Sequence, residues 1–149
     1  MRKPFVLLLI LSLLFMSSCS RSACSGDIAY ELLRICPDGA RVYSSLSEAD
    51  DEGYIDEPML YTLYGNEHVG VSDFSIILYG GVTSPREIGI FIARTGDDRI
   101  NLFEIATERI AFLSSFADGE GFVKKYHGVF VYGFVDDALG FEKALDAIL

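Results

Sequence analysis

The chain has 149 residues, half of them apolar, and its 22 acidic residues against 12 basic ones give a formal net charge of −10. This length suits a single domain, and the composition is that of a globular rather than a disordered chain. The acidic balance argues against nucleic acid as a partner, because neutralising phosphates requires clustered lysine and arginine side chains.

The first eighteen residues have the parts of a secretory leader. Basic residues at positions 2 and 3 precede an almost uninterrupted apolar run from Phe5 to Met16. This run of about 12 residues is too short to cross a bilayer core of ~30 Å as a helix. We therefore expect residues 1–18 to be a signal peptide rather than a permanent membrane span.

The residues after the apolar run favour lipid attachment over ordinary secretion. Met16-Ser17-Ser18-Cys19 resembles a bacterial lipobox, in which small residues precede a cysteine whose thiol receives a diacylglyceryl group. Cleavage by an ordinary signal peptidase and a short uncleaved anchor are the alternatives. We predict that Cys19 carries the lipid, and that its acyl chains hold the protein on the extracytoplasmic face of the cell membrane.

Two further cysteines, Cys24 and Cys36, would remain as an even pair in an oxidising compartment. A helix predicted over residues 27–36 would separate them by about 13 Å, which argues against a disulfide. Neither cysteine has a second cysteine or a histidine at metal-ligand spacing. We therefore expect no metal and no cofactor.

The predicted elements begin with a tether of small residues at 19–26, after which residues 27–149 form one domain. Asp27 is expected to cap the first helix, which ends at residue 36 before Pro37-Asp38-Gly39. The inner face of this helix is predicted to carry Ile28, Leu32 and Ile35.

The middle of the chain predicts a short strand, a helix and a hairpin. The short strand is expected at residues 41–44, and the helix at 56–64, with Asp56 as its cap and Gly65 at its end. Two β-branched and aromatic runs, 73–79 and 87–94, then predict an antiparallel hairpin with a long loop.

The last third of the chain predicts a long helix, a second hairpin and a last helix. A long helix is expected to about residue 116, strands at 122–125 and 129–135, and a last helix from Asp136 or Asp137. The inner stripe of the long helix is predicted to contain Ile100, Phe103, Thr107, Ile110 and Leu113, widened by Ile105, Phe112 and Phe116. The inner face of the last helix is predicted to contain Ala138, Phe141, Leu145 and Ile148.

From residue 73 the order of elements is ββαββα, preceded by one or two short helices. This order predicts an α+β fold, in which an antiparallel sheet of about four strands has its helices packed on one face.

Several motifs of residues 56–149 occur together in one protein family. They are Leu63-Tyr64-Gly65 after a helix, Gly80-Gly81 after a strand, Pro85-Arg86-Glu87-Ile88-Gly89-Ile90-Phe91, the hairpin of 126–135, and Asp136-Asp137. In these motifs the chain resembles the bacterial lipoproteins called domain of unknown function 4358. The resemblance implies lipid tethering and a place near machinery that O-acylates envelope polysaccharides. The brief segment 116–121 departs from the longer, proline-containing stretch usual in that family.

The acidic segment 48–56 is either a calcium loop or a solvated loop that ends in a helix cap. Its acids fall on several EF-hand positions, but Met59 occupies the twelfth position, where calcium requires a bidentate glutamate. We therefore expect the solvated loop.

Glu87 is the candidate for a functional carboxylate. It follows the turn of the first predicted hairpin, where its carboxylate has two possible roles. It could bind a ligand, or it could fix the turn by accepting hydrogen bonds from the Thr83 and Ser84 hydroxyls. We expect the second role. His68 and His127 lie in predicted turns without an adjacent nucleophile, so no catalytic triad is predicted.

Together these features predict a non-enzymatic, lipid-anchored binding or scaffold domain of the cell envelope. Its sheet, or the cleft between the helix of 56–64 and the sheet, would contact another envelope protein or a glycan. The tyrosines that could form such a surface, or be half-buried structural residues, are Tyr54, Tyr61, Tyr64 and Tyr126. The alternatives are an accessory enzyme of envelope polysaccharide modification that uses Glu87 with His127, and a calcium-dependent adhesion module.

Overall fold

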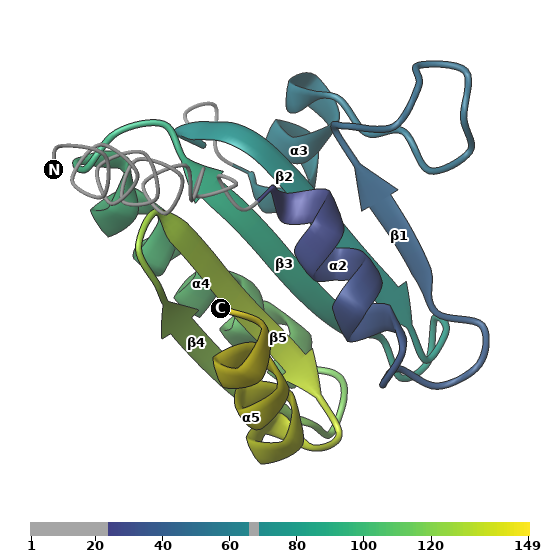
Figure 1. Ribbon diagram of the computed structural model, residues 1–149. Helices are drawn as coiled ribbons and strands as arrows, with labels where there is room; N and C mark the ends of the chain where they lie inside the picture. The colour runs from purple at the N-terminus through teal and green to yellow at the C-terminus, as the bar shows by residue number, and fades with distance from the viewer. Residues whose placement is uncertain (1–23, 66–68) are drawn as a thin grey trace, which may run out of the picture.

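The computed structural model of this protein describes residues 24–65 and 69–149. In these ranges four helices accompany one antiparallel five-stranded sheet, whose strand order is β1-β2-β3-β5-β4 (Figure 1). The elements are α2 (Ser25–Leu33), β1 (Arg41–Ser44), α3 (Glu57–Tyr64), β2 (Val71–Tyr79), β3 (Arg86–Ala93), α4 (Asp98–Ser114), β4 (Glu120–Lys125), β5 (Val129–Val135) and α5 (Ala138–Ile148). The predicted α+β class is confirmed, and β1 joins the edge of the sheet as a fifth strand. The predicted leader, Cys19 and His68 lie outside the described residues.

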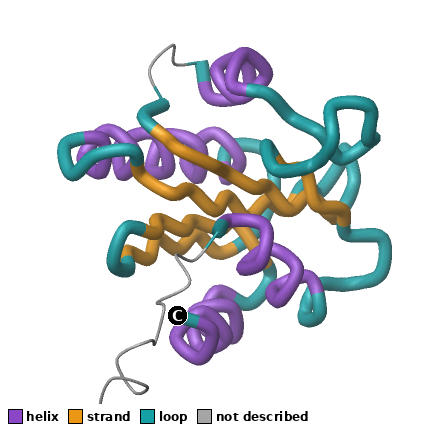
Figure 2. Tube along the Cα trace, turned by 45° about the horizontal axis from the view of Figure 1, so that its top comes forward, coloured by secondary structure: helices purple, strands orange, loops and turns teal. Residues whose placement is uncertain are grey.

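Helices cover both faces of the sheet, so the prediction that they pack on one face is wrong. Figure 2 shows helices on either side of the layer of strands. Helices α2 and α5 pack on one face with Ile77, Ile88 and Val131, and helices α3 and α4 pack on the other with Phe91 and Tyr132. The reason lies in β5, every residue of which is buried, and in β3, which is a continuous apolar run from Ile88 to Ala93. Such runs are typical of strands covered on both faces.

The first helix begins inside the predicted tether. Ser25 is fully buried, and its hydroxyl forms a 2.9 Å hydrogen bond with that of Ser75 in β2. The cap of α2 is Cys24, whose sulfur accepts a hydrogen bond from the backbone N–H of Asp27, so the prediction of Asp27 as the cap is wrong. The helix ends at Leu33, and Ile35 therefore lies beyond it and is exposed.

The two described cysteines are free. Cys24 precedes α2 and Cys36 follows it, so the helix holds them apart. Burial raises the pKa of the Cys36 thiol from 9.0 to about 11, which keeps it protonated at neutral pH.

The predicted ends of α3 are confirmed. The Asp56 carboxylate accepts a hydrogen bond from the backbone N–H of Met59 at 2.8 Å, and Gly65 ends the helix in the left-handed conformation, with φ of 65°. Of the two candidate caps for α5, Asp137 is the one used: it accepts a hydrogen bond from the N–H of Gly140.

The side that the long helix α4 turns to the sheet agrees with the predicted one only in part. Among its described side chains the buried ones are Leu102, Ile105, Ala106 and Leu113, of which Ile105 and Leu113 belong to the predicted stripe. The side chain of Ile100, also predicted to face inward, lies outside the described part. Phe103, Thr107, Phe112 and Phe116, which were expected to face inward, are exposed. Large apolar residues occur all round α4, so their spacing alone does not determine which side is buried. The actual orientation turns Arg109 toward the sheet.

Two strand glycines are each covered by the aromatic ring of the residue directly opposite. Gly89 pairs with Tyr132 on the α4 side of the sheet, and Gly133 pairs with Phe122 on the α5 side. A Cβ atom at either glycine would lie 2.2 Å from a ring carbon of its partner. Glycine is therefore required at both positions, and at Gly89 it lets Tyr132 lie low across the sheet.

Candidate functional site

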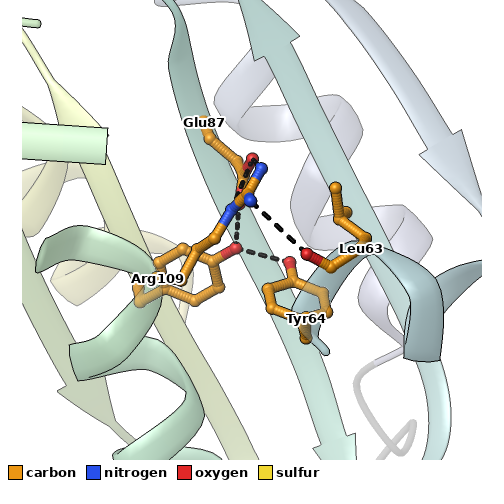
Figure 3. A network of polar contacts seen from close by, with 5 residues as sticks. Leu63, Tyr64, Glu87 and Arg109 are labelled. Atoms are coloured by element: carbon orange, nitrogen blue, oxygen red, sulfur yellow. Dashed lines mark hydrogen bonds and ion pairs between the residues drawn. The ribbon is translucent and has the colours of Figure 1, made fainter. Parts of the chain in front are cut away.

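A buried ion pair joins β3 to α4. Glu87 lies at the start of β3 with its side chain under α4, and the residue is only 1% exposed. The guanidinium of Arg109 donates to the carboxylate through Nε, 2.9 Å from Oε1, and through Nη2, 2.6 Å from Oε2 (Figure 3). This is the bidentate geometry in which an arginine binds a carboxylate most strongly.

Two tyrosines and a backbone carbonyl extend this pair into a network. The Tyr132 hydroxyl donates to Glu87, and a further hydrogen bond joins it to the Tyr64 hydroxyl. Arg109 also donates through Nη1 to the carbonyl oxygen of Leu63, 3.4 Å away. Figure 3 shows these groups converging from α3, α4 and the sheet. The network therefore fixes α3 and α4 to each other and to β3 and β5.

The electrostatics of the network favour one charged pair and two neutral phenols. Burial raises the pKa of Tyr132 and of Tyr64 well above the ordinary value, and the negative charge of Glu87 raises both further. Burial opposes the charge of Arg109, but its hydrogen bonds and ion pair with Glu87 outweigh this and raise its pKa. The guanidinium also lies 5.4 Å from the ring centroid of Phe112.

The network is suited to holding structure and poorly suited to proton transfer. Both oxygens of Glu87 already accept hydrogen bonds from Arg109, and one of them also accepts from Tyr132. Breaking a buried pair costs about 3–5 kcal/mol, because one charge is left uncompensated. Glu87 would have to lose its partner before it could act as a general base.

The turn-fixing role predicted for Glu87 is wrong. Its partners lie in α4 and β5, because strand alternation points its side chain beneath α4. The Ser84 hydroxyl instead accepts a hydrogen bond from Arg86 at 3.0 Å, and no hydrogen bond of Thr83 occurs among the described residues. Arg86 also pairs with Asp136, which connects the β2–β3 turn to the start of α5.

The predicted rival pair of Glu87 and His127 is also wrong. Glu87 lies opposite Phe134 near one end of β5, whereas His127 lies in the turn before Val129 at the other end. Five residues of strand separate these positions, about 17 Å at ~3.3 Å per residue. The two side chains belong to opposite ends of the sheet.

The described residues contain no group of three or more histidine, cysteine, aspartate or glutamate side chains arranged to hold a metal ion. In the acidic loop, Asp56 caps α3, and Asp51 accepts a hydrogen bond from the N–H of Gly53. None of the helices in the described ranges is long and apolar enough to span a membrane.

A cleft lies between α3 and the sheet, where the sequence predicted a binding surface. It has a volume of about 310 Å³. Its lining is almost wholly apolar and comprises Tyr43, Ile55, Met59, Thr62, Leu63, Ile76 and Leu78. We call this space the apolar cleft.

A second hollow of about 390 Å³ adjoins the apolar cleft and shares Tyr43 and Leu78 with it. Arg41, Arg86 and Arg109 line it, together with Glu87 and the glycine-rich β2–β3 turn. We call it the arginine hollow, and the two spaces together the groove. Two further hollows lie close by, one between α3 and α4 and one between α2 and the acidic loop, with volumes of about 320 and 250 Å³.

Sequence reasoning missed Arg109, which was not considered for the inner face of α4. One signal could have found it: Glu87 directly precedes the apolar run of β3 from Ile88 to Ala93, and a buried carboxylate requires a basic partner. The predicted tyrosine surface is found only in part. Tyr64 belongs to the network, and Tyr126 is a half-buried residue whose hydroxyl donates to Asp146.

Comparisons of the chain with protein-family models, with curated proteins and with solved structures found no match. The resemblance to the bacterial lipoprotein family stays a prediction. The case for a function therefore rests on the residues of this chain.

Proposed function

We propose that this protein is a lipid-anchored binding domain on the extracytoplasmic face of the cell membrane, and that it binds its partner in the groove. The anchor is supported by the sequence, in which a basic start, an apolar run and small residues precede Cys19. The binding role is supported by the shape and lining of the α3/α4 face.

One observation carries the binding role: on this face, no helix of the described residues covers the corner of the sheet formed by β1 and β2. Tyr43 of β1 and Leu78 of β2 form the floor of the groove and stay partly exposed. Met59 beside them is 53% exposed, and Val82 in the turn is 96% exposed. Apolar side chains gathered around a hollow are typical of binding surfaces rather than of an inert exterior.

A binding role also agrees with the hydrogen bonds and positions of the two residues considered for catalysis. Glu87 is fully engaged by Arg109 and Tyr132, and His127 lies at the far end of the sheet. A rigid network beneath an open groove stabilises the two helices that form its walls. Such preorganisation lowers the entropic cost of binding.

The binding role can be tested by site-specific photocrosslinking in intact cells. A photoreactive residue at Met59 would project from the apolar cleft, and one at Leu139, which is 60% exposed on the opposite face, is the matched control. We expect one discrete crosslinked species from Met59 and none from Leu139. Equal crosslinking patterns from both positions would contradict the proposal.

The anchor is tested separately by metabolic labelling with a fatty acid. We expect the wild-type chain to incorporate the label and to stay with the membrane fraction. The Cys19→Ala variant should lose both, whereas Cys24→Ala should keep both. Undiminished labelling of Cys19→Ala would show that this cysteine is not the attachment site.

A further inference from the structure

Three features of the groove together identify the chemistry of its ligand: a concentration of positive charge, an adjoining apolar cleft, and a scarcity of polar partners in that cleft. The inference drawn from them rests on the proposed binding role of the groove. It does not depend on the lipid anchor.

Positive charge is concentrated in the arginine hollow. Three of the 12 basic residues of this acidic chain line it, against a single acidic residue, Glu87. Arg109 is compensated by Glu87, and Arg86 by Asp136. Arg41 is exposed, and within residues 24–65 and 69–149 no acidic side chain forms an ion pair with it. Arg41 is therefore the one arginine of the hollow that forms no ion pair within the described residues. It also lines the neighbouring hollow of the acidic loop, together with Asp51 and Glu52.

The charged and apolar parts of the groove are adjacent because of the strand register. Arg41, Leu78 and Glu87 lie directly opposite one another on three neighbouring strands. The next row on the same face of the sheet begins with Tyr43 and Ile76. Residues two apart along a strand are separated by about 7 Å. A ligand that crosses from one row to the next therefore leaves a cationic site and enters an apolar one.

The apolar cleft offers almost no hydrogen-bonding partners. Thr62 contributes one of the two hydroxyl groups in its lining, and that hydroxyl already donates to the carbonyl of Pro58. A peptide backbone or a sugar lying there would lose hydrogen bonds to water without replacement, which opposes its binding. A hydrocarbon chain carries no such groups, so its burial is favourable throughout.

We propose that the groove binds an anionic amphiphile, a molecule with a single hydrocarbon chain and a carboxylate or phosphate head. The head pairs with Arg41 at the mouth of the arginine hollow. The chain passes over Leu78 into the apolar cleft between α3 and the sheet. The two hollows have a combined size in the range of ~300–1,000 Å³ that is typical of small-molecule sites.

The test is a titration of the full-length chain, produced with Cys19→Ala so that no attached acyl group competes. The probes are dodecanoate and dodecyl phosphate below their micellar concentrations, with dodecanol as the neutral amphiphile of equal chain length. Binding is followed through the NMR signal of the Met59 methyl group. We expect saturable binding of at least one anion. Dodecanol should bind about fivefold more weakly, because it cannot form the exposed ion pair with Arg41 and such a pair contributes about that much to affinity. Comparison of the two anions distinguishes a fatty acid from a phosphate-headed lipid.

Two substitutions locate the head of the ligand. Arg41→Gln should weaken binding of the anions to the level of dodecanol and leave dodecanol itself unchanged. The control is Arg34→Gln, which changes an exposed arginine directly after α2 that pairs with Glu31, and it should change neither. No saturable binding of either anion, equal binding of anions and alcohol, or equal effects of the two substitutions would overturn the inference. A discrete crosslink from Met59 in cells would in that case leave the proposed binding role intact with a different ligand.

Discussion

The two faces of the sheet differ in how completely their helices cover them and in the contacts that hold those helices. On one face, α2 and α5 contact each other and close over the sheet. They enclose an apolar core, beside which the buried hydroxyls of Ser25, Ser75 and Ser44 are hydrogen-bonded in a short chain. On the other face, α3 and α4 are held by the Glu87–Arg109 pair and two tyrosines, and a corner of the sheet stays open beside them. The buried ion pair between Glu87 and Arg109 thus belongs to the face that has a gap, where it fixes the two helices beside the gap.

The largest expected effect comes from breaking the ion pair. Glu87→Gln should reduce the free energy of unfolding by about 3 kcal/mol, because Arg109 keeps its charge without a buried partner. Measurement is by urea unfolding. A double variant, Glu87→Leu with Arg109→Met, should be more stable than Glu87→Gln, because it leaves no unpaired charge.

The matched control lies on the other face. Lys124 of β4 forms two partly exposed ion pairs with α5, at 3.5 and 3.6 Å, so Lys124→Met should cost less than about 1 kcal/mol. Equal costs for Glu87→Gln and Lys124→Met would contradict the difference between the two faces.

The glycine–aromatic pairs allow the same substitution to be compared on the two faces of the sheet, because each face has one such pair. Gly89→Ala and Gly133→Ala should each cost about 2 kcal/mol, because a new methyl group meets a ring on one face or the other. Only Gly89→Ala should also change the ultraviolet spectrum of Tyr132, whose hydroxyl belongs to the network. Gly96→Ala is the control, since a Cβ atom there meets nothing within 4 Å. Unfolding of Gly89→Ala at the same urea concentration as Gly96→Ala would show that the ring does not cover the glycine.

The raised pKa values of Tyr64 and Tyr132 predict how stability depends on pH. Above about pH 10 the unfolded chain releases these phenolic protons while the folded chain keeps them, so the free energy of unfolding falls as pH rises. Tyr132→Phe should cost roughly 1.5 kcal/mol at pH 7, through loss of the hydrogen bond to Glu87, and should make the alkaline decline shallower. Unfolding curves from pH 8 to 11 measure both. An unchanged decline would mean that Tyr132 is accessible to solvent. Tyr30→Phe is the control, because the side chain of Tyr30 is exposed on the outer side of α2.

The last effect concerns the reactivity of a side chain and not stability, and it tests whether water reaches the closed face at the end of α2. Because burial raises the pKa of Cys36 to about 11, its thiolate fraction at pH 8 is on the order of 100-fold below that of a thiol with pKa 9. We expect Cys36 to react with a thiol reagent much more slowly than Cys24, as measured by peptide mass spectrometry. Equal rates would mean that the end of α2 opens readily.

Much of the fold could be predicted because local signals agree with one another. The bounds of β5 follow from the turn at Gly128 and from Asp136, and the buried side of α5 follows from Phe141 and Leu145, which lie four apart between polar residues. The two-sided sheet could also have been inferred. The residues of β3 and β5 do not alternate between polar and apolar, which indicates helices on both sides.

The candidate site was harder to predict because it depends on the orientation of one helix. Apolar residues surround α4, so the spacing of Phe103 and Phe112 suggested an inner side from which Arg109 was absent. The actual orientation is stabilised by a contact 22 residues away, between Arg109 and Glu87. A contact between residues so far apart in the chain does not appear in the spacing of residues within α4, so the helix sequence alone does not reveal it.

The most direct test of the claim that the α3/α4 face is the binding face is hydroxyl-radical footprinting of the unmodified chain. Met59 is exposed in the apolar cleft, and its thioether is readily oxidised; Leu139 reports on the opposite face. We predict that Met59 is oxidised several-fold more slowly in intact envelopes than in the purified chain, while Leu139 reacts equally in both. Equal oxidation of Met59 in the two preparations would contradict a binding role for the groove.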